Sequence, residues 1–214
     1  MRLPGMGPYP VVLDLAGRPV LVVGGGTVAE RKVEGVLEAG AIVTVVSPTT
    51  TDTLARLERE GRIMVRRRAY RPADLRGATI VFAATDDRIV NAAVATDARK
   101  HRIWVNAADD PDHCDFILPS VLRRGSLLVA VTTAGRSPAL ARVVREHLEA
   151  VLGEEYAALV DLASDVRREL RALGAAPSAE AWTRALGGDD IRHLLAEGRR
   201  DEARRRLLEA LGVA

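Results

Sequence analysis

The sequence predicts an α/β protein in which a parallel β-sheet is followed by a short antiparallel segment and a helical region. Apolar runs of strand length alternate with helical periodicity as far as about residue 110, which is typical of a sheet with helices on both faces. After about residue 113 this alternation stops, and from Ser137 onward the pattern is helical. We therefore expect three parts, at residues 1–112, 113–152 and 153–214.

The first part opens with a strand, a glycine-rich turn and a helix. The stretch VLVVGGGTVAERK, residues 20–32, begins with four apolar residues, as a strand buried on both faces requires. A short leading strand is expected before it, within residues 10–15, followed by a turn at Gly17. A helix is expected over residues 27–39, because apolar residues recur there at helical spacing and Gly40 follows them.

The glycine-rich turn has the pattern of a dinucleotide-binding loop. Gly24, Gly26 and Ala29 fit G-x-G-x-x-A, in which the first glycine makes a tight turn and the second lets the main chain approach a pyrophosphate. Ala29 would let the helix pack closely against the strand, and free N–H groups at the helix start would bind the anion. A second strand at residues 41–48 completes a β-α-β unit of the expected length. The pattern therefore predicts a Rossmann-type sheet that binds a dinucleotide.

The tip of the second strand does not decide between NAD and NADP by charge. An acidic residue there would bind the ribose hydroxyls of NAD, and a nearby arginine would bind the 2′-phosphate of NADP. The chain has Ser47, Pro48 and Thr49 at this place, with neither an acid nor a closely following arginine. A hydroxyl of Ser47 or Thr49 can hydrogen-bond a ribose, so NAD is the expected cofactor.

The rest of the sheet is predicted from apolar runs that alternate with helical segments. Polar residues follow two of these strands, namely Thr85 to Asp87 and Asp109 with Asp110. Asp86 or Asp87 is expected to cap the next helix. The expected elements are a helix at 52–60, a strand at 62–70, a brief turn at 72–75, a strand at 79–87, a helix at 88–99 and a strand at 103–111.

The second and third parts are predicted to be a ribbon followed by helices. The stretch FILPSVLRRGSLLVAVTT contains two short strands around the turn Arg123–Gly125, and Ser137 with Pro138 marks a helix start. The ribbon is too short to be stable alone, and the helix after it has an apolar face, so residues 113–152 are expected to form a homodimer. That face comprises Leu140, Val143, Val144, Leu148 and Val151, and further helices are expected at about 154–173, 178–186 and 189–211.

Composition argues against several classes of partner. The 31 basic residues face 29 acidic ones and aromatic residues make up only 3%, so no nucleic-acid partner is expected. The densest basic stretches are residues 65–71 and 197–206, and acids at helical spacing interrupt the second. The sequence shows no signal peptide and no apolar run near 18 residues, so we expect a cytoplasmic protein without a membrane partner. Cys114 is the one cysteine, which excludes an internal disulfide and a multi-cysteine metal site, and we expect a buried, inert thiol.

Four blocks in order carry a resemblance to a known family. They are VLVVGGGTVAERK, FAATDD, VNAADDPDHCDFILPS and VTTAGRSPALARVVREHLE. Together, over about Tyr9 to Leu152, they resemble the precorrin-2 dehydrogenase/sirohaem synthase N-terminal family. The resemblance implies a Rossmann domain, a dimerisation segment and a helical domain. It also implies NAD-dependent removal of two hydrogens from precorrin-2, giving sirohydrochlorin.

The resemblance assigns the catalytic role to one of two adjacent acids. The family's catalytic aspartate lies in the stretch N-x-x-D-x-P, which here places it at Asp109. A carboxylate at the carboxyl end of a parallel strand can take the proton that leaves when hydride passes to the nicotinamide. Asp110 is the alternative if the loop swaps the two side chains, and both acids could instead only cap the turn before Pro111.

The remaining site residues follow from the motifs and from the resemblance. Thr133 lies where the family often has a serine near the substrate, and Asn106 opens the catalytic stretch, so both are expected to bind substrate. No metal site is expected, although His113 and His147 are the histidines that could touch iron. The expected cofactor-binding residues are Gly24, Gly25, Gly26, Thr27, Val28, Ser47, Pro48 and Thr85.

Three other functions remain open from the sequence. Some family members also insert Fe²⁺ into sirohydrochlorin, and Asp109 could serve that reaction as well. A non-catalytic nucleotide-sensing module, such as the regulatory Rossmann domains of potassium channels, would not need the acid at Asp109 or the stretch CDFILPS. A dehydrogenase for another substrate would usually bring a Lys, His or Tyr to the strand ends, and none stands out there.

Overall fold

The computed structural model describes residues 7–213, which form two compact units, one ending at Ile117 and the other beginning at Leu118. We call residues 7–117 the sheet unit and residues 118–213 the C-terminal unit. Within the described residues, none of the helices combines the length and the apolar character that crossing a bilayer requires.

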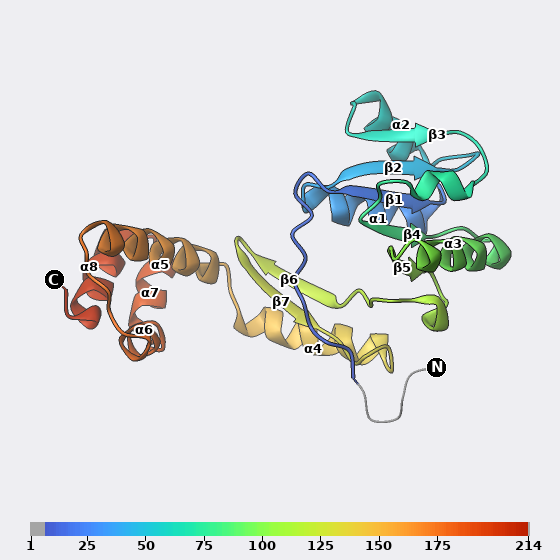
Figure 1. The fold of residues 1–214 in the computed structure, drawn as a ribbon. Helices are drawn as coiled ribbons and strands as arrows, with labels where there is room; N and C mark the ends of the chain where they lie inside the picture. The colour runs from blue at the N-terminus through green and yellow to red at the C-terminus, as the bar shows by residue number, and fades with distance from the viewer. Residues whose placement is uncertain (1–6, 214) are drawn as a thin grey trace. The chain divides into compact units, whose positions relative to one another are not determined.

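The sheet unit is built on five parallel strands (Figure 1). Their order is β3-β2-β1-β4-β5, so β1 lies at the centre with β2 and β4 paired to it. This is the Rossmann-type arrangement that the sequence predicts, and the change of direction between β2 and β4 leaves a crevice at the carboxyl end of β1. The strands are β1 (Pro19–Val23), β2 (Ile42–Val46), β3 (Ile63–Arg66), β4 (Ile80–Ala83) and β5 (Trp104–Ala107).

Helices cover both faces of this sheet. One face packs against α1 and α2 through a core that includes Val22, Val33 and Phe82. The other packs against α3 and the short 3-10 helix η1 through a core that includes Leu21, Leu75 and Val94. The elements are α1 (Thr27–Glu38), α2 (Asp52–Arg59), η1 (Pro72–Leu75), α3 (Arg88–Lys100) and a second 3-10 helix, η2 (Pro111–His113).

Local sequence signals explain where these helices begin. The Thr51 hydroxyl accepts a hydrogen bond from the Leu54 N–H at the start of α2. Asp87 accepts from the N–H groups of Ile89 and Val90, so Asp87 and not Asp86 caps α3. Side chains therefore satisfy first-turn donors that the helix itself leaves free.

Two expectations for the sheet unit are wrong in detail. The leading strand within residues 10–15 does not form, and Val11 and Val12 are exposed there. Both sides of β1 are already paired, so this segment has no free neighbour beside it. The strands at 62–70 and 103–111 are also shorter than expected, because the chain turns away into loops after Arg66 and Ala107.

The C-terminal unit begins with the predicted antiparallel ribbon and its helix. Strands β6 (Ser120–Arg124) and β7 (Leu127–Val131) pair around Gly125, and α4 (Pro138–Val151) packs against the ribbon. Ser137 caps α4 through its side chain, as predicted, by accepting from the Leu140 N–H at 3.2 Å. Few side chains of α4 are buried, Ala141 among them. Most of its apolar face is therefore left exposed within the described residues.

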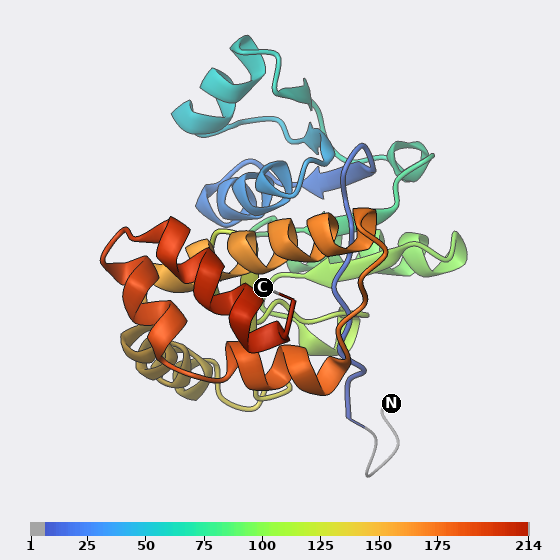
Figure 2. The ribbon, with the colours of Figure 1, turned by 90° about the vertical axis from the view of Figure 1, so that its left-hand side faces the viewer.

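Four more helices complete the C-terminal unit and pack around one core (Figure 2). They are α5 (Glu155–Ala172), α6 (Ala179–Leu186), α7 (Asp190–Ala196) and α8 (Arg200–Leu211). The prediction of a single helix over 189–211 is wrong, because a turn separates two helices there, α7 and α8. Gly198 has a left-handed φ of 74° there, and the Arg199 N–H turns back to the Leu194 carbonyl. This is the hydrogen-bonded glycine ending that stops a helix.

The basic stretch at residues 197–206 is largely paired with acids. Arg200 and Arg204 on α8 lie 2.9 and 2.6 Å from Asp165 and Glu169 on α5. Arg206 lies 2.9 Å from Asp190, and Arg199 also pairs with acids of its own segment. The stretch is thus a solvent-exposed face laced with ion pairs, as its acid spacing predicts.

One buried carboxylate holds the loop after β3. The side chain of Asp74, at 2% exposure, accepts hydrogen bonds from Arg68 at 2.6 Å, from Arg66 at 2.7 Å and from the Arg71 N–H at 2.9 Å. Chiefly the hydrogen bond from Arg68 lowers the pKa of Asp74 to about 2. The folded protein therefore favours the ionised form of this group.

We expect Asp74→Asn to destabilise the sheet unit by about 2–3 kcal/mol at pH 7, because a shift of roughly two pKa units is lost. The lowered pKa stabilises the fold above the unfolded value near about 4, and this contribution disappears as pH falls from about 4 towards 2. The difference between variant and wild type should therefore shrink at pH 3. Urea unfolding followed by Trp104 fluorescence measures the free energy of unfolding of each protein. Trp182→Phe in all of them leaves Trp104 as the one tryptophan.

The matched control is Glu60→Gln, which removes an exposed i,i+4 pair with Arg56 in the same unit. Exposed pairs of this kind contribute about 0.3–0.5 kcal/mol. Two results would contradict the role given to Asp74. One is an equal loss of unfolding free energy in the two variants at pH 7, and the other is a difference between Asp74→Asn and wild type that stays constant down to pH 3.

Candidate nucleotide-binding and catalytic site

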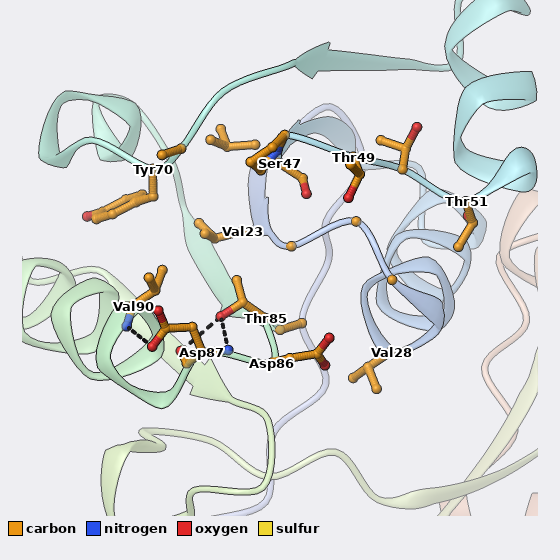
Figure 3. A pocket seen from close by; sticks show the side chains of 18 of the residues that line it. Val23, Val28, Ser47, Thr49, Thr51, Tyr70, Thr85, Asp86, Asp87 and Val90 are labelled. Carbon is orange, nitrogen blue, oxygen red and sulfur yellow. Dashed lines mark hydrogen bonds between the residues drawn. The ribbon is translucent and has the colours of Figure 1, made fainter.

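A cavity of about 650 Å³ opens at the carboxyl ends of β1, β2 and β4 (Figure 3). The glycine loop runs through its centre, with Ser47, Thr49 and Thr51 on one side and Thr85 and Asp87 on the other. All eight predicted cofactor-binding residues line this cavity. The strand order places it at the reversal point of the sheet, where open α/β sheets bind ligands.

The first two glycines of the loop are required by contacts inside the protein. A Cβ on Gly24 would lie 2.2 Å from the Ala84 carbonyl oxygen, and Gly24 has a φ of 126°. A Cβ on Gly25 would lie 1.9 Å from the Thr49 carbonyl oxygen. Side chains at these positions would push apart the ends of β1, β2 and β4.

The third glycine faces open space. No atom of the described protein lies within 4 Å of a Cβ placed on Gly26, the residue that precedes α1. The first N–H groups of α1, beginning at Thr27 and Val28, have no partner within the helix and end at the cavity. Together with the helix dipole, they form a cradle that fits a phosphate group.

The wall formed by residues 47–51 carries hydroxyl groups. Ser47 follows β2 directly and is buried, and the Thr51 N–H donates to the Gly25 carbonyl at 2.9 Å. This bond ties the wall to the glycine loop. Pro48 and Thr49 complete it, so hydroxyl and backbone groups, with no acid among them, face the cavity here.

The opposite wall is held by a hydrogen-bond network around Thr85. Its Oγ1 lies 2.8 Å from Asn91 Oδ1, and the Asn91 amide donates back to the Thr85 carbonyl at 2.9 Å. The Asp87 N–H also approaches the same hydroxyl, at 3.2 Å (Figure 3). The Thr85 side chain thus fixes the turn into α3 and lines the cavity at the same time.

Sequence reasoning missed Tyr70, which borders the cavity beside the β2 end. Its hydroxyl lies 3.4 Å from Asp97 Oδ2. Burial, with the Asp97 carboxylate, raises the pKa of Tyr70, so the phenol stays protonated. Its place in the loop after β3 was the available signal, since the carboxyl ends of neighbouring parallel strands lie together.

Asp109 and Asp110 have different surroundings in the loop after β5. The Asp110 carboxylate lies 2.6 Å from His113 Nδ1. Asp109 is exposed, has a left-handed φ of 55°, and its carboxylate has no hydrogen-bond partner within residues 7–213. The preceding residue, Ala108, bonds to the Ala83 carbonyl at 2.8 Å, next to the cavity wall at Ala84.

Side chains of Asn106, Cys114 and Asp115 close this loop. The Asn106 amide donates to the Phe116 carbonyl at 2.9 Å, and the Cys114 sulfur contacts backbone atoms of Ala107 and Asp110. Asp115 covers the free edge of β5 by accepting from the Val105 N–H at 3.0 Å. Burial raises the pKa of the Cys114 thiol, which fits a structural role. The Asn106 amide is thus engaged inside the protein.

Thr133, His147 and His113 are the other predicted groups. Thr133 belongs to the C-terminal unit, where its hydroxyl lies 2.9 Å from the Ser137 carbonyl and accepts from the Ser137 N–H. His147 is exposed on α4, and His113 pairs with Asp110. Among residues 7–213, no group of three His, Cys, Asp or Glu side chains is arranged to hold a metal ion.

Two family descriptions match the chain. A family described as putative NAD(P)-binding matches residues 11–120, slightly more than half of the chain. A family described as sirohaem biosynthesis protein central matches residues 124–150. The first match covers most of the sheet unit with its cavity, and the second covers β7 and nearly all of α4.

Curated relatives carry the name sirohaem synthase. The one from Methylococcus capsulatus is 43% identical over 207 residues, which cover 96% of this chain and 44% of that protein. Siroheme synthase 3 of Aeromonas hydrophila is 41% identical over 191 residues, 88% of this chain and 41% of that protein. The chain thus spans less than half the length of these relatives.

A solved structure is similar over nearly the whole chain. The protein described as SirC, precorrin-2 dehydrogenase, is 30% identical, with a TM-score of 0.73 that covers 97% of this chain and all of that one. The family matches, the relatives and this structure agree with one another and confirm the resemblance in the sequence blocks. The chain therefore belongs to the precorrin-2 dehydrogenase/sirohaem synthase N-terminal family.

Proposed function

We propose that the protein catalyses NAD-dependent dehydrogenation of precorrin-2 to sirohydrochlorin. The observation that carries this proposal is the placement of an unpaired carboxylate, Asp109, in the loop after β5, the strand that pairs with β4 at the wall of the cavity. A base and a hydride acceptor at neighbouring strand ends are what removal of two hydrogens requires. The solved relative with this reaction in its name supports the substrate.

The glycine loop and the start of α1 bind the cofactor's pyrophosphate in this proposal. The open space at Gly26 admits the phosphates, and the N–H groups of Thr27 and Val28 donate to them. Ser47 and Thr49 supply hydroxyls for the adenosine ribose. When bound, NAD supplies the hydride acceptor.

Ion pairs around β3 support NAD over NADP. The Ser47 N–H bonds to the Arg66 carbonyl, so the arginines at the end of β3 lie next to the ribose wall. Arg66 and Arg68 are held by Asp74, and Arg67 lies 2.6 Å from Glu58. These three arginines, each of which could attract a 2′-phosphate, are therefore already engaged with carboxylates of the protein.

Asp109 takes a proton from the substrate in this proposal. The Asp109 carboxylate has no hydrogen-bond partner within the described residues, so it can accept a proton from a ligand. The Asp110 carboxylate, in contrast, is hydrogen-bonded to His113. The loop bonds of Cys114 and Asp115 keep the strand end in place. Asparagine tolerates the left-handed backbone of this position as aspartate does, so Asp109→Asn removes basicity without straining the loop.

We also propose that the protein acts in the cytoplasm as a homodimer formed through the ribbon and α4. Val143, Val144 and Val151 are exposed on α4, and Val121 is exposed on β6. Association would remove these apolar side chains from water, and a two-fold pair is the commonest arrangement. The match of residues 124–150 to a sirohaem family supports a family role for this segment.

Gly26→Val should abolish or greatly weaken nucleotide binding while the protein stays folded, because the new side chain occupies space that the pyrophosphate needs. Isothermal titration calorimetry with NAD and with NADP measures this. Wild type should bind NAD more tightly than NADP.

The matched control is Gly35→Val, at a glycine within α1 that does not line the cavity and whose Cβ would also meet open space. It should bind NAD like wild type. Undiminished affinity in a folded Gly26→Val protein would remove the basis for the pyrophosphate site, and tighter binding of NADP by wild type would refute the cofactor preference.

Asp109→Asn should lower turnover of precorrin-2 by about 10²–10⁴-fold, the usual contribution of general acid–base catalysis. Its affinity for NAD should stay near wild type, because the phosphate cradle is at Gly26. NADH formation at 340 nm, with precorrin-2 generated in place, gives the rate.

Asp110→Asn is the control, since it changes the adjacent acid and loses the bond to His113. Its rate should fall far less. If Asp109 only caps the turn, its loss would cost about 1 kcal/mol of stability and leave turnover intact. A rate for Asp109→Asn within threefold of wild type would move the base to another residue.

Sedimentation at micromolar concentration should give about twice the 23.0 kDa of the chain. Val144→Glu places a charge in the apolar face and should yield a folded monomer, whereas Glu146→Gln on the same helix should remain dimeric. Monomeric wild type, or a Val144→Glu protein that still dimerises, would count against this interface.

A further inference from the structure

Lys32 is a half-buried cation that the proposed mechanism does not use. It lies on α1, six residues after Gly26, and its side chain is partly shielded from solvent. Within residues 7–213 its ammonium group has no hydrogen-bond or ion-pair partner. Its recorded contact is with an aromatic ring, since Nζ lies 5.9 Å from the centre of the Phe82 ring.

The aromatic cluster beneath Lys32 belongs to the strand ends at the site. Phe82 lies on β4 and meets Phe116 edge to face, with 5.6 Å between ring centres. Phe116 accepts the hydrogen bond from Asn106 that closes the loop after β5. Ala108, which directly precedes Asp109, packs against the same face of the core. Lys32 therefore lies on the side of the sheet where the loop of Asp109 begins.

Lys32 lies on the same side of α1 as a residue that lines the cavity. Val28 lines the cavity, and Lys32 lies four residues later, one turn down the same helix face. Side chains in a helix point back towards its N-terminus, so the stem of Lys32 extends along the turn of α1 that carries Val28. An ammonium placed there can meet a ligand that extends from the cavity towards Asp109.

The charges around Lys32 agree with this placement. Burial, helped by Arg31, lowers the pKa of Lys32, while the Cys114 sulfur and the Asp109 carboxylate act in the opposite direction. Both of these groups belong to the loop after β5. A half-buried cation of this kind is stabilised when an anion of a ligand pairs with it.

We propose that Lys32 binds a carboxylate side chain of the macrocyclic substrate and so places the ring edge against Asp109. This inference rests on the proposed function, whose substrate carries acetate and propionate groups around its ring. Lys32 would then act in substrate binding, and Asp109 in proton removal. Neither the glycine motif nor the resemblance assigns a role to this residue.

The test compares Lys32→Met with Lys32→Arg and with Arg31→Met. Methionine keeps most of the apolar stem over Phe82 and removes the charge. Arg31 is the exposed neighbour on the same helix, so Arg31→Met makes the same change of formal charge and keeps the Lys32 ammonium. Steady-state kinetics with precorrin-2 and calorimetry with NAD are measured for all three variants and for wild type.

We expect Lys32→Met to raise KM for precorrin-2 about tenfold or more, the usual cost of a lost charged hydrogen bond, with a much smaller change in kcat. Its Kd for NAD should stay within twofold of wild type. Lys32→Arg should recover part of the loss, and Arg31→Met should match wild type. A KM within twofold of wild type for Lys32→Met, or the same rise in Arg31→Met, would overturn the proposal.

Direct binding of sirohydrochlorin, the macrocyclic product, separates this proposal from the proposed function. Quenching of protein fluorescence gives its Kd without any turnover. If wild type binds the macrocycle but forms no NADH, the dehydrogenase function fails, and weaker binding by Lys32→Met still supports the carboxylate contact. If wild type and Lys32→Met bind it equally, the contact is refuted whatever the rate. If wild type does not bind it at all, both proposals fall.

Discussion

Close packing of bare backbone between three strand ends is the constraint on which the site depends. Gly24 lies against Ala84 at the end of β4, and Gly25 lies against Thr49 beyond β2. With no side chain between them, the ends of β1, β2 and β4 stay bonded to one another, and α1 starts directly at the cavity. The first two glycines therefore build the cradle, and the third leaves room in it. Substitution of Gly24 or Gly25 would therefore disturb folding itself, so a loss of ligand binding in such a variant would not identify a ligand contact.

Much of the sheet unit is predictable because its signals are local. Buried strands need apolar runs, and the glycine motif requires a strand before it and a helix after it, so the sheet and its cavity follow from short stretches. The leading strand does not form next to β1 because β2 and β4 already pair with both sides of β1, which the sequence does not show. The place of Tyr70 at the cavity and the contact of Lys32 with Phe82 are missed for a similar reason, since they depend on how the loop after β3 and α1 pack. Asn106 matches a motif, yet its amide serves the loop.

Two adjacent acids illustrate how a fold can give neighbouring residues different tasks. A left-handed backbone at Asp109 turns the chain so that the next carboxylate meets His113. One acid is thereby held within its loop, and the other keeps its lone pairs for solvent or a ligand. Most side chains strain in such a conformation, while aspartate and asparagine accept it more readily. The residue type that the proposed chemistry needs is thus also one that the turn accepts.

The ion pairs of the arginines determine the electrostatic potential that a distant charge experiences near this protein. A sequence pI near 9.0 suggests a positive surface. Yet Arg66, Arg67 and Arg68 each face a carboxylate, and Arg200 and Arg204 of α8 face acids of α5. Opposite charges a few ångströms apart form dipoles, whose potential falls off faster than that of single charges. At physiological salt, where screening acts over about 8 Å, little of the field from these stretches would reach an approaching polyanion.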